Sequence, residues 1–196
     1  MAWTQSWDLC AHVAIVREGK NAGTYGEGPE YETIWSFGPQ CGVSNGETIA
    51  RAGYLCDYYG LDTISVGNTI GFLMECYEKG LITSEDTGGI DLRFGDAHAM
   101  VAAADLAGQG VGKLAELVSN GVRKAVEQIG RGSEKFAIHS KGLELPAYCP
   151  RAGQGMGLNL QLVTGALATF RHGRLALRCF SLHRRIRGRL KAKLNQ

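Results

Sequence analysis

Apolar residues recur at intervals of three and four between residues 49 and 129, which is the spacing of amphipathic helices. The first predicted helix opens at a capping box, in which Ser44 is followed three positions later by Glu47, and it ends at Gly60, where a closing glycine belongs. Ser65 is the predicted cap of a second helix. This region is therefore predicted to be helical.

The helical pattern continues beyond residue 80. Asp96 is the predicted cap of a third helix, and apolar residues keep helical spacing from Val111 to Ile129. The Asn120–Gly121 pair can divide that stretch in two. Residues 136–148 are predicted to be extended chain that ends at a turn.

Three segments follow from these patterns. Residues 1–43 are rich in glycine and poor in periodic signal, so they are predicted to be loop and short extended pieces. Residues 44–159 form the helical domain, and residues 160–196 form a basic tail. The predicted fold class is mainly α, with short strands at most and an irregular N-terminal segment.

Charge is divided unevenly along the chain. Residues 1–170 carry 12 basic and 19 acidic side chains, whereas the part from Arg171 onward carries nine basic and no acidic ones. No run of apolar residues is long enough to cross a membrane, and the first residues lack the basic start of a secretion signal. We therefore expect a cytoplasmic protein without a membrane partner.

The segment Gly28–Glu32, GPEYE, has an unusual composition. Glu30 and Glu32 flank a tyrosine directly after a stiff glycine–proline pair. On residue types alone, the segment is either a rigid turn with solvated acids or a carboxylate that is held beside a cofactor.

A second acidic pair lies at the end of the first predicted helix. Asp57 occupies its last turn, Gly60 ends it, Leu61 anchors the turn and Asp62 follows at once. An ionised carboxylate only accepts hydrogen bonds, so it suits a ligand edge that is rich in N–H donors, such as the amino-pyrimidine edge of a pterin. The alternative interpretation is an ordinary helix end.

Five ordered motifs, over about residues 10–159, resemble the aldehyde ferredoxin oxidoreductase family. They are GPEYE (Gly28–Glu32), DYYGLDTIS (Asp57–Ser65), MECYEKGLI (Met74–Ile82), GIDLRFGDA (Gly89–Ala97) and LELPAYCPR (Leu143–Arg151). The resemblance implies a tungsten, or sometimes molybdenum, centre held by two pterins beside a [4Fe–4S] cluster. It also implies oxidation of a small aldehyde to a carboxylic acid, with ferredoxin as the electron acceptor.

The resemblance assigns roles residue by residue. Asp57, Gly60, Leu61 and Asp62 match the family's first pterin-binding motif, and Glu32 matches a glutamate near the metal that is proposed to assist proton transfer. Cys10 is a remnant ligand position for the iron–sulfur cluster.

The chain also departs from the family pattern. A cluster needs four thiolates, and of the three that the family supplies ahead of GPEYE, only Cys10 is present in either alignment register. The family's second pterin motif is not in this sequence, and Arg51 and Tyr54 replace a Glu and a His that help bind an iron between subunits in some members. We therefore expect an internal fragment of such an enzyme, inactive by itself.

The tail has two interpretations. The family continues at this point with an Arg-Gly-Ala-Cys-His segment. One set of synonymous codons for Leu160–Thr169 encodes that segment when it is read in another frame. The first interpretation is therefore that residues from about 160 onward are the product of a frameshift. Alternatively, the tail is a basic amphipathic helix of a non-catalytic module, which binds nucleic acid or an anionic membrane; we expect no nucleic-acid partner. Within the family, a different substrate, such as an aromatic acyl-CoA, also stays open.

Overall fold

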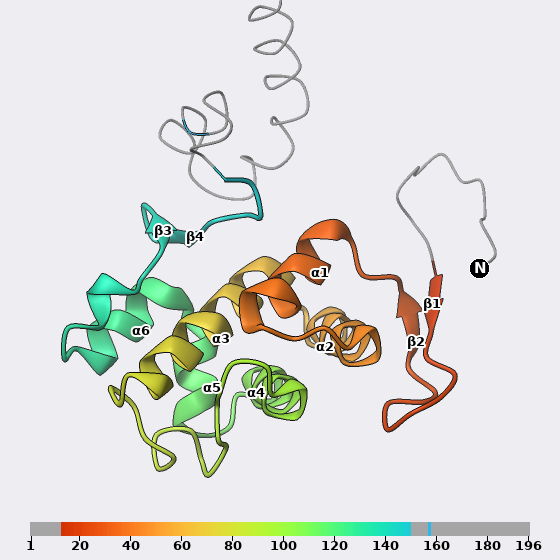
Figure 1. Cartoon of the computed structure of the whole chain (residues 1–196), viewed down its shortest axis with the longest axis horizontal. Coiled ribbons are helices and arrows are strands. Elements are labelled where there is room, and N and C mark those ends of the chain that lie inside the picture. Colours follow the sequence, from red (N-terminus) through yellow and green to blue (C-terminus); the bar gives the residue numbers. More distant parts are fainter. Residues whose placement is uncertain (1–12, 150–156, 158–196) are drawn as a thin grey trace, which may run out of the picture. The chain divides into compact units, whose positions relative to one another are not determined.

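The computed structural model describes residues 13–149 and residue 157 (Figure 1). Cys10 and the predicted tail at 160–196 lie outside the described residues. The chain divides into two units, 1–147 and 148–196, and every helix and strand named below belongs to the first unit.

The N-terminal part is more ordered than its sequence suggests. Strands β1 (Val13–Ile15) and β2 (Tyr25–Glu27) pair in antiparallel fashion, with Ala14 opposite Gly26. Helix α1 (Tyr31–Phe37) and the 3₁₀ turn η1 (Pro39–Cys41) follow. The prediction of loop and extended chain is therefore wrong over α1, because a helix of seven residues is too short to show a period and is stabilised by packing instead.

Helices α2 (Gly46–Tyr59) and α3 (Thr63–Glu78) lie where they were predicted, but their caps differ. Asn45, not Ser44, caps α2 and accepts from the backbone N–H groups of Glu47 and Thr48. Asp62, not Ser65, caps α3, and its Oδ2 accepts from the Ser65 N–H at 2.7 Å. Both capping residues are two to three positions ahead of the N–H groups that they satisfy, as cap geometry requires.

The remaining helices are α4 (Ala97–Gln109), α5 (Gly112–Ser119) and α6 (Gly121–Ile129), followed by the 3₁₀ turn η2 (Ser133–Lys135). Asp96 caps α4, and the helical stretch is interrupted at Asn120–Gly121, between α5 and α6. Both predictions are therefore confirmed. The segment predicted to be extended contains a short hairpin of β3 (His139–Ser140) and β4 (Leu143–Glu144).

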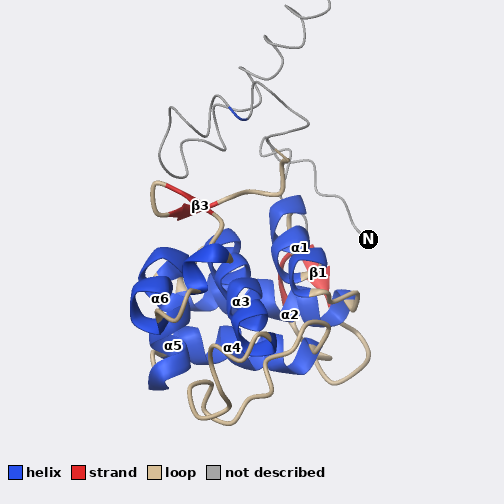
Figure 2. Ribbon diagram, turned by 60° about the vertical axis from the view of Figure 1, so that its left-hand side comes forward, coloured by secondary structure: helices blue, strands red, loops and turns tan. Residues whose placement is uncertain are grey.

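Helix α3 is the centre of the core. It packs against α1, α2, α4, α5 and α6, and its residues from Val66 to Met74 are all buried (Figures 1 and 2). The large side chains with no exposed surface include Phe37, Ile70, Leu73, Met74, Leu92 and Met100. The predicted mainly α class is confirmed. Over the described part of the chain, every helix is too short or too polar to cross a membrane.

Candidate functional site

The start of α1 lies against the end of α2 and the start of α3. Thr33 Oγ1 is 2.9 Å from Thr63 Oγ1, and the Ser36 hydroxyl donates to the Thr63 carbonyl at 3.0 Å. Glycines permit this close approach: a Cβ at Gly67 would lie 2.6 Å from the Ser36 Cβ, and one at Gly53 would lie 3.1 Å from the Thr33 Cγ2. The GPEYE segment is thereby fixed beside the turn that joins α2 to α3.

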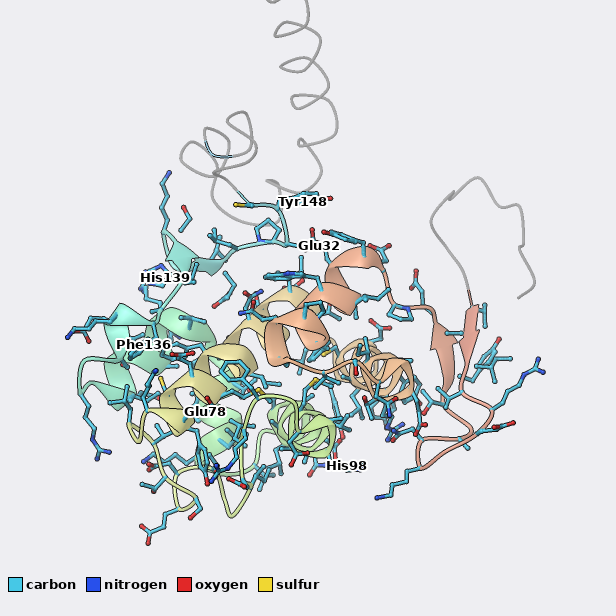
Figure 3. All side chains as sticks on the ribbon, in the orientation of Figure 1. Glu32, Glu78, His98, Phe136, His139 and Tyr148 are labelled. Atoms are coloured by element: carbon cyan, nitrogen blue, oxygen red, sulfur yellow. The ribbon has the colours of Figure 1, made fainter. Side chains whose placement is uncertain are left out.

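Glu32 lies in the first turn of α1 and faces the chain that follows β4 (Figure 3). Its Oε2 accepts from the Ala147 N–H at 2.9 Å. Its Oε1 is buried and has no hydrogen-bond partner within the described residues. One oxygen of this carboxylate is therefore held, and the other is a buried acceptor for which the described residues provide no donor.

The surroundings of Glu32 disfavour its negative charge. Burial raises the pKa of Glu32 above its ordinary 4.5, the Ala147 N–H acts in the opposite direction, and the charge of Asp62 raises the pKa further. A carboxyl of this kind holds its proton to a higher pH than a solvated glutamic acid.

The four residues of the predicted pterin motif form one helix-to-helix turn. Gly60 has a left-handed conformation, with φ of 71°, and the Leu61 N–H donates to the Cys56 carbonyl at 2.8 Å. Asp57 precedes this turn and Asp62 ends it as the cap of α3. The turn therefore sets the spacing of the two acids.

Asp57 opens onto two hollows. The larger, of about 540 Å³, is also lined by Gly26, Tyr54 and Leu61, and the smaller, of about 170 Å³, is also lined by Pro29 and Thr63. Burial raises the pKa of Asp57, and so does the charge of Glu27, which lines both hollows. Sequence reasoning missed Glu27, although it directly precedes the Gly28–Pro29 pair.

The cysteines of this region are enclosed thiols. Cys41, Cys56 and Cys76 are free and buried, and burial raises the pKa of each to about 12. The described residues contain no group of three or more His, Cys, Asp or Glu side chains arranged to hold a metal ion. The described part of the chain therefore has no donor set for an iron–sulfur cluster, and Cys10 lies outside it.

Comparison with known proteins gives a family match. The model of the family described as aldehyde ferredoxin oxidoreductase, domains 2 and 3, matches residues 9–173. The chain is 37% identical, over 133 residues, to a tungsten-containing aldehyde ferredoxin oxidoreductase of Thermococcus kodakarensis, and this covers 67% of the chain but 22% of that protein. The corresponding enzyme of Pyrococcus abyssi is 38% identical over 135 residues, with 67% of the chain and 22% of that protein covered.

A relative with another name is similar at the same level. The chain is 34% identical, over 142 residues, to the WOR-like subunit of an aliphatic sulfonate oxidoreductase of Pyrococcus furiosus, which covers 71% of the chain and 23% of that protein. The chain thus spans less than a quarter of the length of these relatives.

Proposed function

The chain belongs to the aldehyde ferredoxin oxidoreductase family, and from this premise we propose that it supplies one side of a tungsten-pterin active site. The activity of the whole enzyme is oxidation of an aldehyde to a carboxylic acid, with ferredoxin as the electron acceptor. The observation that carries the proposal is the buried Oε1 of Glu32, which lacks a donor among the described residues. Family membership favours this function over a non-catalytic helical module with a basic tail.

The residues present fit such a cofactor. Glu27, Glu32, Asp57 and Asp62 surround the α2–α3 turn, and within the described residues none of the four forms an ion pair. Carboxylates that are close together and unpaired favour a partner that brings N–H donors or positive charge. The N–H-rich edge of a pterin has this chemistry.

Each residue of the turn has a distinct part. Asp57 and Asp62 would accept hydrogen bonds from pterin N–H groups, and Asp62 would do so while its Oδ2 caps α3. Gly60 and Leu61 do not need to contact the ligand through their side chains. They keep the two acids at a fixed separation because the turn between them is closed by backbone hydrogen bonds.

A bound tungsten bis-pterin, or its molybdenum counterpart, would supply the two-electron acceptor for this oxidation, and in the intact enzyme a [4Fe–4S] cluster would be the link to ferredoxin. Conversion of an aldehyde and water into a carboxylate releases three protons together with these two electrons. Glu32 accepts one of these protons on Oε1, while the Ala147 N–H holds Oε2. Its raised pKa makes the ionised Glu32 carboxylate a stronger base than a solvated glutamate.

Binding of free pterin (2-amino-4-oxopteridine) to the purified chain tests this proposal. We expect quenching of pterin fluorescence and shifts of the Asp57 to Asp62 amide resonances. Both effects should weaken at least tenfold in an Asp57→Asn, Asp62→Asn double variant, because neutral amides lose the charge-assisted hydrogen bonds. Asp91→Asn is the matched control, since Asp91 is an exposed acid in the loop between α3 and α4. Equal affinity in the double variant and the control contradicts the assignment.

Metal analysis separates binding of a pterin from assembly of a complete centre. We expect the purified chain to contain less than one tungsten and less than one [4Fe–4S] cluster per molecule, because Cys10 is the single cluster thiolate among the expected ligand positions. Stoichiometric tungsten together with pterin contradicts the expectation that the chain is inactive by itself.

A further inference from the structure

The segment from Glu144 to Ala147 is tied to the helical core by hydrogen bonds to three different helices, α6, α3 and α1. Glu144 accepts from the Val122 N–H, in the first turn of α6, at 2.7 Å. One residue later, the Leu145 carbonyl accepts from the Asn68 side-chain amide at 3.2 Å, across 77 positions of sequence. The third tie is the hydrogen bond from the Ala147 N–H to Glu32.

Asn68 is an unusual residue for the middle of a buried helix. It lies on α3 with 6% of its surface exposed, and burial of an amide is unfavourable unless its hydrogen bonds are made. Its Nδ2 carries two hydrogens: one bonds the Ile64 carbonyl of its own helix at 2.8 Å, and the other reaches Leu145. The bond to Ile64 lies within α3, whereas the bond to Leu145 is the one by which Asn68 joins α3 to a distant segment of the chain.

Pro146 joins the two backbone groups that are held. It lies between the Leu145 carbonyl, which Asn68 binds, and the Ala147 N–H, which binds Glu32. The pyrrolidine ring fixes φ of Pro146 near −65°, which removes one of the few torsions by which these two groups could move independently. The position of the Leu145 carbonyl therefore largely sets the position of the Ala147 N–H.

We propose that Asn68 is a positioning residue for Glu32: by holding the Leu145 carbonyl, it keeps the Ala147 N–H on Oε2 and leaves Oε1 as the open acceptor. Among the described residues Asn68 makes no hydrogen bond to Glu32, and it acts through three residues of backbone. The proposal rests on the proposed role of Glu32 as proton acceptor, but its test measures the Glu32 carboxyl directly and is valid whether or not that role is correct.

The test is an NMR titration of the 196-residue chain, in which the Glu32 carboxyl carbon and the Ala147 amide are followed with pH. In the unaltered chain, the Ala147 amide resonance should move in step with ionisation of Glu32, because the two are hydrogen-bonded. In Asn68→Ala, this movement should be lost. The Glu32 pKa should also rise, since the Ala147 N–H opposes the upward effects of burial and of Asp62.

Asn120→Ala is the matched control. The Asn120 Nδ2 donates to the Glu116 carbonyl at 2.8 Å, which is the same local bond that Asn68 makes to Ile64. Within the described residues the Asn120 side chain makes no hydrogen bond to residues 144–147. We expect this variant to leave the titrations of Glu32 and Ala147 unchanged. Asn68→Leu is a second variant, for use if Asn68→Ala does not fold. Leucine removes the amide but keeps a side chain of similar volume, so the same changes at Glu32 and Ala147 are expected.

Ala147→Pro provides an independent reference, because proline removes the N–H itself. If Ala147→Pro raises the Glu32 pKa while Asn68→Ala and Asn68→Leu leave it unchanged, Asn68 has no positioning role and the proposal is overturned. If the Asn68 variants reproduce the effect of Ala147→Pro and the Asn120 control does not, the proposal stands.

Discussion

Thr33 Oγ1 and Thr63 Oγ1 lie 2.9 Å apart and join the first turn of α1 to the first turn of α3. The residue before each threonine is an acid of the candidate site, Glu32 or Asp62. The threonine contact therefore also places these two like charges near each other, and Asp62 raises the pKa of Glu32 in consequence. Packing between the helices, rather than any attraction between the acids, brings the site together.

Replacement of either threonine by valine should lower the free energy of unfolding by about 1 kcal/mol, because one hydroxyl then loses its partner in a largely buried place. Urea denaturation of Thr33→Val, Thr63→Val and the double variant measures this effect. The double variant should be less destabilised than the sum of the single variants, because both remove the same bond. Strict additivity would show that the two hydroxyls do not interact.

Asp62 combines a structural role with an electrostatic one, and two variants separate them. Asp62→Ala should lower the free energy of unfolding by about 1 kcal/mol through loss of the α3 cap, whereas Asp62→Asn should retain most of that stability because asparagine is also a good cap. Both should lower the pKa of Glu32, since both remove the charge that raises it. Urea denaturation and carboxyl NMR check the two effects separately.

Glu32 should make the stability of the chain fall as the pH rises above about 4.5. Below that value its carboxyl is protonated in both the folded and the unfolded state. As the pH rises through 4.5 toward the higher folded pKa, the unfolded chain ionises first, so the contribution of Glu32 to stability is lost.

Glu32→Gln should therefore gain stability relative to the unaltered chain over this pH window, as measured by thermal unfolding at a series of pH values. Glu85→Gln, which removes one charge at an exposed position, is the control. A difference between Glu32→Gln and the unaltered chain that stays constant with pH would contradict the assigned pKa shift.

Gly67→Ala should lower the free energy of unfolding by about 1–3 kcal/mol, since the new Cβ would overlap Ser36 and force α1 away from α3. Gly46→Ala is the matched control: it also lies in a helix, but a Cβ there would meet no atom within 4 Å. The control should be neutral or slightly stabilising, because alanine favours helix more than glycine does. Equal behaviour of the two variants would argue against close packing of α1 on α3.

The reading-frame hypothesis for the tail is tested by the gene. The family match ends at residue 173, beyond residue 159 where the sequence interpretation places the change, so the nucleotide sequence is the deciding observation. We expect the codons for residues 160–169 to encode Arg-Gly-Ala-Cys-His in a second frame. Codons that cannot do so would remove the hypothesis and leave the tail as genuine coding sequence.

The sequence predicts well those features whose cause is local. Asp96 caps α4 and the Asn120–Gly121 pair separates α5 from α6, because a capping acceptor and a glycine each act within one turn of helix. The left-handed Gly60 is a third feature of this kind. For α2 and α3 the helices are correct, but Ser44 and Ser65 are not the caps, since an Asx residue in a better position takes that role in each case.

The candidate site is less predictable because its contacts are distant in sequence. The composition of the GPEYE segment and the two aspartates mark the acids, but no local pattern indicates that Ala147 binds Glu32 across 115 positions. Helix α1 is also missed, because its stability comes from burial of Thr33, Ser36 and Phe37 against neighbouring helices. Tertiary packing, which has no period of its own, decides both features.

The three buried cysteines can be used to measure local opening of the core. A thiolate, not a thiol, reacts with alkylating agents, so Cys41, Cys56 and Cys76, with pKa values of about 12, are unreactive while the helices around them stay packed. These cysteines lie on η1, α2 and α3. The alkylation rate at each therefore measures how often its own part of the core opens to solvent. Two of these elements also hold site acids, because Asp57 lies on α2 and Asp62 caps α3.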